Sequence, residues 1–168
     1  KSCATQNFGG CIHNRKYGQL LMNNTTLAHC QSRYGGCINY AQNTRSTITN
    51  SEVFNCYAQD WGGAINIGDS SKVTLVATRI SDSTSSYYGG CISSESQVQL
   101  KIIDSIVQRC TLSASFANGA GISLWNKTSL TLLSTHVSEC SCLQFFDLTF
   151  GGGIYTYYNA NVFFKKFN

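Results

Sequence analysis

One short motif recurs along the chain at nearly constant spacing, and this repeat constrains the fold more than any other feature. In each copy, two or three small residues precede an Ile, and the copies begin at Gly9, Gly35, Gly62, Gly89, Gly119 and Gly151. The steps between the copies are 26, 27, 27, 30 and 32 residues. A fixed period of this length is typical of a chain built from stacked structural repeats.

Further columns of equivalent residues follow each glycine motif. Thirteen residues after the first Gly stands a large apolar residue, in turn Met22, Ile48, Leu75, Ile102, Leu132 and Phe164. A second apolar column follows as Leu27, Val53, Ile80, Val107 and Val137, and a cysteine column as Cys3, Cys30, Cys56, Ser83, Cys110 and Cys140. All variation in length lies between the cysteine column and the next glycine motif. We interpret that segment as a loop.

Within each repeat the apolar residues alternate with polar ones, as in Val73-Thr74-Leu75-Val76. Alternation with a period of two is the pattern of a β-strand with one buried face. A strand this short cannot bury its apolar face alone, so equivalent strands must stack and build the core between them. The sequence therefore predicts an all-β fold, a single parallel β-helix over residues 1–168 with about six coils of about 27 residues.

Two kinds of corner are expected between the strands. A polar column suits a turn in which side chains bond neighbouring backbone, and it reads Asn24, Asn50, Ala77, Asp104 and Ser134, each followed by Ser or Thr. The Gly-Gly pairs suit a corner that needs a positive φ or leaves no room for a Cβ atom. The residues directly before them are Phe8, Tyr34, Trp61, Tyr88, Asn118 and Phe150. Five of these six are aromatic, which predicts an aromatic stack along the glycine corner.

The third repeat carries a family resemblance. Trp61-Gly62-Gly63-Ala64-Ile65, preceded by Val53-Phe54-Asn55-Cys56, resembles the repeats of polymorphic outer membrane proteins and related pectin-lyase-like surface proteins. The resemblance extends over all six coils. It implies a right-handed parallel β-helix displayed on a cell surface, with a role in adhesion. Cys stands where the bacterial repeats usually have Asn, which resembles the Cys-rich versions in secreted proteins of single-celled eukaryotes.

Composition narrows the class of partner and the compartment. Only 12% of the residues are charged, the net charge is +4 and the basic residues are scattered, so we expect no nucleic-acid partner. No apolar run is long enough for a membrane span. Nine cysteines without a CxxC motif favour an extracellular or cell-surface protein with disulfides. Asn23, Asn24 and Asn126 begin N-glycosylation sequons, which suits that compartment.

The disulfide connectivity stays open. Neighbours within one column meet the Cα separation of a disulfide, which gives Cys11–Cys37, Cys110–Cys140 and either Cys3–Cys30 or Cys30–Cys56 as candidates. The alternative pairs the two columns across the loop, as Cys3–Cys11 and Cys30–Cys37. The odd total leaves at least one cysteine without an intramolecular partner, and we expect Cys91 and Cys142 to lack one.

The sequence does not favour catalysis or metal binding. Polysaccharide lyases and hydrolases of this fold class need at least two carboxylates close together in a groove, within about 6 Å, and we do not expect the coils to supply them. Asp82 and Glu139 share a column with Arg109 between them, which suggests a charge-balanced surface ladder. His13, His29 and His136 occupy three different columns, so we expect no metal site and no cofactor.

A structural or adhesive role is therefore predicted. The chain starts at Lys1, just before Cys3, and stops at Asn168, four residues before the cysteine column would recur. This continuity suggests copies that self-associate head to tail into a filament, or a segment of a longer surface solenoid. The lateral surface, rich in Tyr, Asn, Ser and Thr, is expected to carry or bind glycans. The alternative is a polysaccharide-binding or polysaccharide-cleaving protein of the pectate lyase or polygalacturonase type. A partner surface is expected on the lengthened loops, at Phe116, Asn118, Phe145, Phe146 and Asp147.

Overall fold

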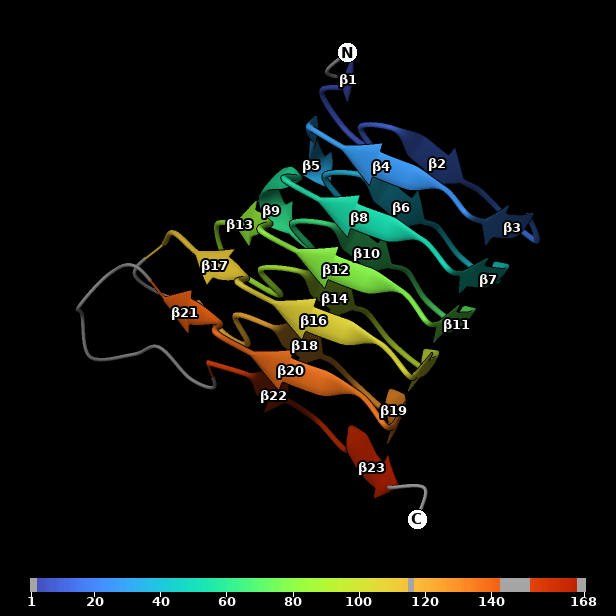
Figure 1. Ribbon diagram of the computed structural model, residues 1–168, viewed down its shortest axis with the longest axis vertical. Coiled ribbons are helices and arrows are strands. Elements are labelled where there is room, and N and C mark those ends of the chain that lie inside the picture. The colour runs from blue at the N-terminus through green and yellow to red at the C-terminus, as the bar shows by residue number, and fades with distance from the viewer. Residues whose placement is uncertain (1–2, 115–116, 143–151, 166–168) are drawn as a thin grey trace.

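The chain winds into a stack of parallel β-strands, seen from the side in Figure 1 with the long axis vertical. The computed structural model describes residues 3–114, 117–142 and 152–165. Within these ranges β-strands are the regular elements, and they form four parallel sheets. Strands β2 to β21 make five turns, and β22 and β23 begin a sixth. The prediction of an all-β, parallel β-helix with about 27 residues per turn is confirmed.

Each turn contributes one strand to each sheet. Sheet A contains β1 (Cys3–Ala4), β5 (Cys30–Tyr34), β9 (Tyr57–Trp61), β13 (Thr84–Ser85), β17 (Thr111–Leu112) and β21 (Ser141–Cys142). Sheet B contains β2 (Ile12–Asn14), β6 (Ile38–Tyr40), β10 (Ile65–Ile67), β14 (Ile92–Ser94), β18 (Ile122–Leu124) and β22 (Ile154–Thr156). Sheet C contains β3 (Gln19–Asn23), β7 (Arg45–Thr49), β11 (Lys72–Val76), β15 (Gln99–Ile103), β19 (Ser129–Leu133) and β23 (Asn161–Lys165). Sheet D contains β4 (Thr26–Ala28), β8 (Glu52–Phe54), β12 (Arg79–Ser81), β16 (Ile106–Gln108) and β20 (His136–Ser138).

The register of the sheets follows the columns of the sequence. In sheet B the Ile of one glycine motif pairs with the Ile of the next, as Ile38 with Ile65 and Ile65 with Ile92. In sheet C, Leu75 lies between Ile48 and Ile102. These side chains are at most 1% exposed, so the stacked columns form one continuous apolar core. Burying such side chains is the main favourable contribution to folding of a solenoid.

The corner between sheets C and D is a repeated left-handed turn. Its first residue has a positive φ in every coil, including 50° at Asn24 and 47° at Ala77. The Ser or Thr that follows donates its hydroxyl to the carbonyl two residues earlier, as Ser51 does to Thr49 at 2.6 Å. The Ser105 hydroxyl also accepts the Thr78 N–H of the preceding coil at 3.0 Å. This confirms the predicted polar turn, in which side chains satisfy backbone groups.

The glycine corner between sheets A and B meets both conditions expected for it. Gly35 has a φ of +63°, and a Cβ atom on Gly36 would lie 2.2 Å from the carbonyl oxygen of Gly63 in the next coil. The first position therefore needs the left-handed conformation, and the second needs the absence of a side chain.

The segment after the cysteine column is not a simple loop. It contains the strands of sheet A, which are five residues long in β5 and β9 and two residues long in β13, β17 and β21. The extra residues of the last coils follow β17 and β21. The interpretation of the whole segment as loop was therefore wrong, because its short polar strands show little apolar alternation.

The disulfides cross the interior of a single coil. The structure pairs Cys11 with Cys30, Cys37 with Cys56 and Cys91 with Cys110, each 19 residues apart, with Cα separations of 5.8, 5.5 and 5.2 Å. The predicted Cys11–Cys37 and Cys110–Cys140 bonds, and both options for Cys30 along its column, are wrong. The alternative pairs, Cys3–Cys11 and Cys30–Cys37, join the correct two columns. They link a cysteine of the cysteine column to the glycine motif that follows it, whereas the observed bonds link it to the glycine motif that precedes it.

The reason lies in which cysteines meet within one coil. The glycine-motif cysteine and the cysteine 19 positions later come to disulfide distance there, and each such bond takes up the cysteines that a bond along a column would need. Cys91 is therefore paired, contrary to expectation. Cys3, Cys140 and Cys142 are the free cysteines. Cys140 stands 19 residues after Gly121, so its position in the cross-coil pattern has no partner.

Candidate functional site

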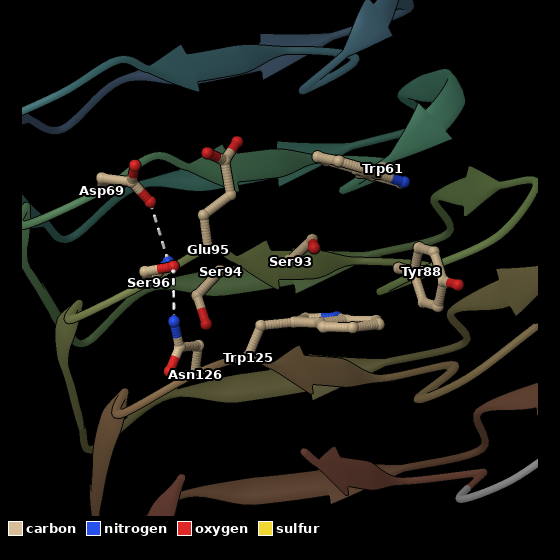
Figure 2. Close-up of a pocket in the computed structure, with 9 residues that line it drawn as sticks. All are labelled: Trp61, Asp69, Tyr88, Ser93, Ser94, Glu95, Ser96, Trp125 and Asn126. Atoms are coloured by element: carbon tan, nitrogen blue, oxygen red, sulfur yellow. Dashed lines mark hydrogen bonds between the residues drawn. The ribbon is translucent and has the colours of Figure 1, made fainter. Parts of the chain in front are cut away.

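A groove of about 500 Å³ lies over sheet B, between its corners with sheets A and C (Figure 2). It spans three coils, so residues far apart in the sequence meet in it. The residues that line it are Trp61, Asp69, Tyr88, Ser93, Ser94, Glu95, Ser96, Trp125 and Asn126.

Three aromatic side chains form the wall of the groove nearest sheet A. Trp61 and Tyr88 stand before the glycine motifs of consecutive coils, with ring centroids 6.1 Å apart. Trp125 follows β18 and meets Tyr88 edge to face, with centroids 4.8 Å apart and planes at 87°. The Trp125 indole N–H donates to the Ser123 hydroxyl at 3.1 Å, which fixes the ring orientation. Figure 2 shows Trp61 and Trp125 on opposite sides of the opening.

The same wall extends the predicted aromatic stack along the solenoid. Phe8, Tyr34, Trp61 and Tyr88 follow one another with centroids 5.2 to 6.1 Å apart, as predicted. In the next coil the column position is Asn118, and Trp125 takes the aromatic place beside Tyr88. Tyr157 then packs on Trp125 at 4.8 Å. Phe150, the remaining aromatic residue of the column, lies outside the described residues.

Two carboxylates occupy the opposite part of the groove. Asp69 Oδ1 accepts the Ser96 backbone N–H at 2.9 Å, and Glu95 Oε1 accepts the Asn66 amide N–H at 3.2 Å. Asn126 Nδ2 donates to the Ser96 hydroxyl at 3.2 Å and closes this side. Asp69 and Glu95 thus line one groove although they occupy different columns, and the expectation that no two carboxylates of a groove lie within about 6 Å stays a prediction.

Burial changes the acidity of Glu95. Its partial burial raises the pKa of the Glu95 carboxyl above the usual value, the negative charge of Asp69 raises it further, and the hydrogen bond from Asn66 opposes both effects. Ionised Glu95 is thus held at a cost in desolvation, and a hydroxyl or amide group that donates to it in the groove would lower that cost.

The chemistry of the lining residues selects a class of ligand. Aromatic faces on one side and hydrogen-bonding groups on the other are typical of small-molecule and sugar sites. Asp69 and Glu95 are acids, and Lys and Arg are absent from the lining of this groove in the described chain. An acidic polysaccharide would be repelled, whereas a neutral, hydroxyl-rich one would find acceptors for its hydroxyl groups.

The three sequon asparagines are all exposed, so their side chains are accessible to modification. Asn23 Oδ1 accepts from the Thr49 hydroxyl at 2.9 Å, and Asn24 forms the left-handed corner. Asn126 lies on the rim of the groove. Occupancy of these sites stays a prediction.

The predicted partner loop lies mostly outside the described residues. Phe116, Phe145, Phe146 and Asp147 lie outside the described residues. Asn118 is half-buried and pairs with Tyr88 in a parallel bridge, so it belongs to the glycine corner.

The charged column at the corner between sheets D and A forms an ion pair. Arg109 Nε lies 2.5 Å from Asp82 Oδ1, and Arg109 Nη2 lies 2.7 Å from Asp82 Oδ2. The hydrogen bonds between the two side chains lower the pKa of Asp82 and raise the pKa of Arg109, and the charges of Asp82 and Glu139 raise the pKa of Arg109 further. The predicted ladder of alternating charge is therefore present at Asp82 and Arg109.

Histidine and cysteine side chains are potential metal ligands. His13 contacts Asn39 through Nδ1 at 3.1 Å and stacks on Phe8, and burial lowers its pKa. Within residues 3–114, 117–142 and 152–165, one group has the geometry to hold a metal: the sulfurs of Cys3, Cys11 and Cys30, which lie within 4.8 Å of one another. Two of these three sulfurs are joined in a disulfide.

Sequence reasoning missed the groove because its residues belong to different columns. Trp61 and Tyr88 were found as part of the aromatic column, but Trp125 lies in the column of Glu95, three positions beyond the Ile of the motif. The sequence did contain one signal. In the aromatic column before the glycine motifs, Asn118 is the one residue that is not aromatic, so the aromatic ring beside Tyr88 has to come from another column.

In the described part of the chain no helix is long and apolar enough to cross a membrane. Comparisons with protein families, curated proteins and solved structures found no match to this chain.

Proposed function

We propose that the chain is an extracellular β-solenoid scaffold that binds a neutral glycan in the groove over sheet B. The observation that supports this most directly is that both tryptophans of the chain line one groove together with two carboxylates. The apolar faces of pyranose rings pack on indole rings, while their hydroxyl groups donate to carboxylates. Binding in this groove, without cleavage, would make the protein an adhesin-like scaffold.

The cysteine chemistry supports the extracellular location. Three disulfides cross the coils, and such bonds persist in oxidising compartments. The exposed sequons at Asn23, Asn24 and Asn126 fit the same compartment, and we propose that at least one carries a glycan. The resemblance to polymorphic outer membrane proteins and pectin-lyase-like surface proteins is consistent with display at a cell surface.

The scaffold role is supported by the last strand of the described stack. Phe164 belongs to an interior column, yet it is 72% exposed because no strand covers β23 on its outer side among the described residues. A further coil would bury it, whether supplied by a longer solenoid or by a second copy stacked head to tail. Unpaired strand edges of this kind promote association between chains.

Intrinsic fluorescence offers a direct test of the glycan site, because the two tryptophans are the chain's only indoles. Neutral oligosaccharides, first selected on a glycan array, are titrated into the folded chain. We expect a saturable change in tryptophan emission, and at least tenfold weaker binding for Trp125→Ala. Tyr17→Ala, which removes an aromatic ring 78% exposed outside the groove, serves as the matched control. Equal affinity of Trp125→Ala and the native chain would contradict the proposal.

Glycoside cleavage is the second candidate, and the shared position of Asp69 and Glu95 is what favours it. Glycosidases use two carboxyl groups, one with a raised pKa that acts as the acid. Incubation with a bound oligosaccharide, followed by chromatography of the products, separates the two functions. Release of shorter sugars that is lost in Glu95→Gln would favour hydrolysis, whereas intact ligand would favour binding alone.

A further inference from the structure

The first coil contains a free thiol beside a disulfide. Cys3 is exposed and unpaired, and its sulfur lies within 4.8 Å of both sulfurs of the Cys11–Cys30 bond. Cys3 and Cys30 are also register partners in adjacent parallel strands, β1 and β5. Such partners lie about 4.8 Å apart, within the Cα range of a disulfide. Cys30 can therefore bond to either neighbour without a change in the strands.

The other two disulfides differ in this respect. The cysteines of the Cys37–Cys56 and Cys91–Cys110 bonds are at most 2% exposed. Neither bond belongs to a cluster of three sulfurs in the described chain. Cys11, by contrast, is only half-buried, so a thiolate there can be solvated.

We propose that Cys3, Cys11 and Cys30 form a thiol–disulfide exchange site. The Cys3 thiol loses its proton to solvent, and its sulfur attacks the Cys30 sulfur. The Cys3–Cys30 bond forms as the Cys11–Cys30 bond breaks, and the electron pair leaves with Cys11, which takes up a proton from solvent. No external oxidant or reductant is needed, because one disulfide and one thiol are present before and after.

The choice of leaving group follows from burial. Cys30 is 1% exposed, so a thiolate at Cys30 would be desolvated, whereas Cys11 is nearer to solvent. Exchange thus moves the free thiol from Cys3 to Cys11. A small disulfide such as oxidised glutathione would react at whichever of the two sulfurs is free: the thiolate attacks one sulfur of the small disulfide, a mixed disulfide forms, and the other half leaves as a thiol.

Peptide mapping of the full chain tests this exchange. The folded protein is alkylated with N-ethylmaleimide at pH 6.5, before and after a period at pH 8, and digested without reduction. Trypsin places Cys3 and Cys11 on residues 2–15 and Cys30 on residues 17–33, because it cleaves after Lys1, Arg15, Lys16 and Arg33. We expect cross-linked 2–15 and 17–33 in two forms, one with maleimide on Cys3 and one with maleimide on Cys11, the second growing at pH 8.

Two variants complete the test. Cys3→Ser should abolish maleimide labelling of Cys11, while Cys142→Ser, which removes a free thiol at the other end, should leave it unchanged. Cys3→Ala serves if the serine variant folds poorly. Labelling of Cys3 alone in the native chain, or equal labelling of Cys11 in Cys3→Ser, would overturn the proposal. Maleimide on Cys30 with a bond between Cys3 and Cys11 would overturn the assignment of Cys11 as the leaving group.

Discussion

At the scale of single residues, Glu95 has a carboxyl group whose ionisation is disfavoured by partial burial in the groove. Its carboxyl is partly buried near Asp69, and one hydrogen bond from Asn66 offsets part of the desolvation. Because the pKa of Glu95 is raised in the folded chain, the folded state holds its proton more tightly than the unfolded state. The stability that this proton contributes is complete at low pH and is lost as the pH rises above the usual value of 4.5.

Substitution of Glu95 should therefore stabilise the chain at neutral pH. Glu95→Gln keeps the oxygen that accepts from Asn66 and removes the buried charge, so we expect a gain on the order of 1 kcal/mol at pH 7. The gain should disappear near pH 4, where the native carboxyl is protonated. Urea unfolding at both pH values measures it, with Glu52→Gln as a control on an exposed strand position. A gain that is equal at both pH values would contradict the role of the charge.

At the scale of elements, the series of cross-coil cysteine pairs is interrupted by one coil that lacks both members. Ala64 and Ser83 stand 19 residues apart, at the positions where the neighbouring coils have Cys37–Cys56 and Cys91–Cys110. Both are fully buried, and the Ser83 hydroxyl accepts the Cys56 N–H at 3.2 Å. Two small residues thus fill the interior where the other coils have a disulfide.

The double variant Ala64→Cys with Ser83→Cys should form a fourth disulfide. We expect it to raise the free energy of unfolding by about 3 kcal/mol, since it closes a loop of similar length to the native bonds. Intact mass under non-reducing conditions and thermal unfolding check the bond and its effect. Ser83→Cys alone is the control and should gain no stability. A double variant that stays a dithiol after oxidation would show that the coil cannot take up the disulfide geometry.

The strands and their register could be predicted from the sequence because each column repeats one physical requirement. The residue equivalent to Ile65 must face the core in each coil, and the glycine equivalent to Gly62 must adopt a positive φ in each coil from Gly9 to Gly119. The cross-coil bonds and the groove could not, because they join residues of different columns. The position of Trp125 against Tyr88 depends on the width of a coil, which a one-dimensional spacing does not contain.

At the scale of the whole molecule, the solenoid has an apolar surface at its last described strand. Phe164 is 72% exposed in an interior column, and Phe163 is 53% exposed on the same strand, β23. Burial of a Phe side chain contributes about 2 kcal/mol or more, so contact at this end would favour association.

Association of the isolated chain should therefore depend on Phe164. We expect sedimentation velocity to show larger species as the concentration rises, and Phe164→Asp to shift them to monomer because a carboxylate would be buried in the contact. Tyr17→Asp, at a lateral position 78% exposed, is the matched control and should associate like the native chain. A native chain that stays monomeric at all concentrations would remove the support for head-to-tail stacking.

The position of Asn126 has a practical consequence for anyone who produces this protein. Its side chain lies on the rim of the groove and holds the Ser96 hydroxyl. An oligosaccharide attached there by a eukaryotic host would lie beside Trp125 and compete with added sugar for the same indole. Material from bacteria and material from a glycosylating host would then behave as two different reagents. The first would have an open binding site, and in the second the attached glycan would occupy the groove.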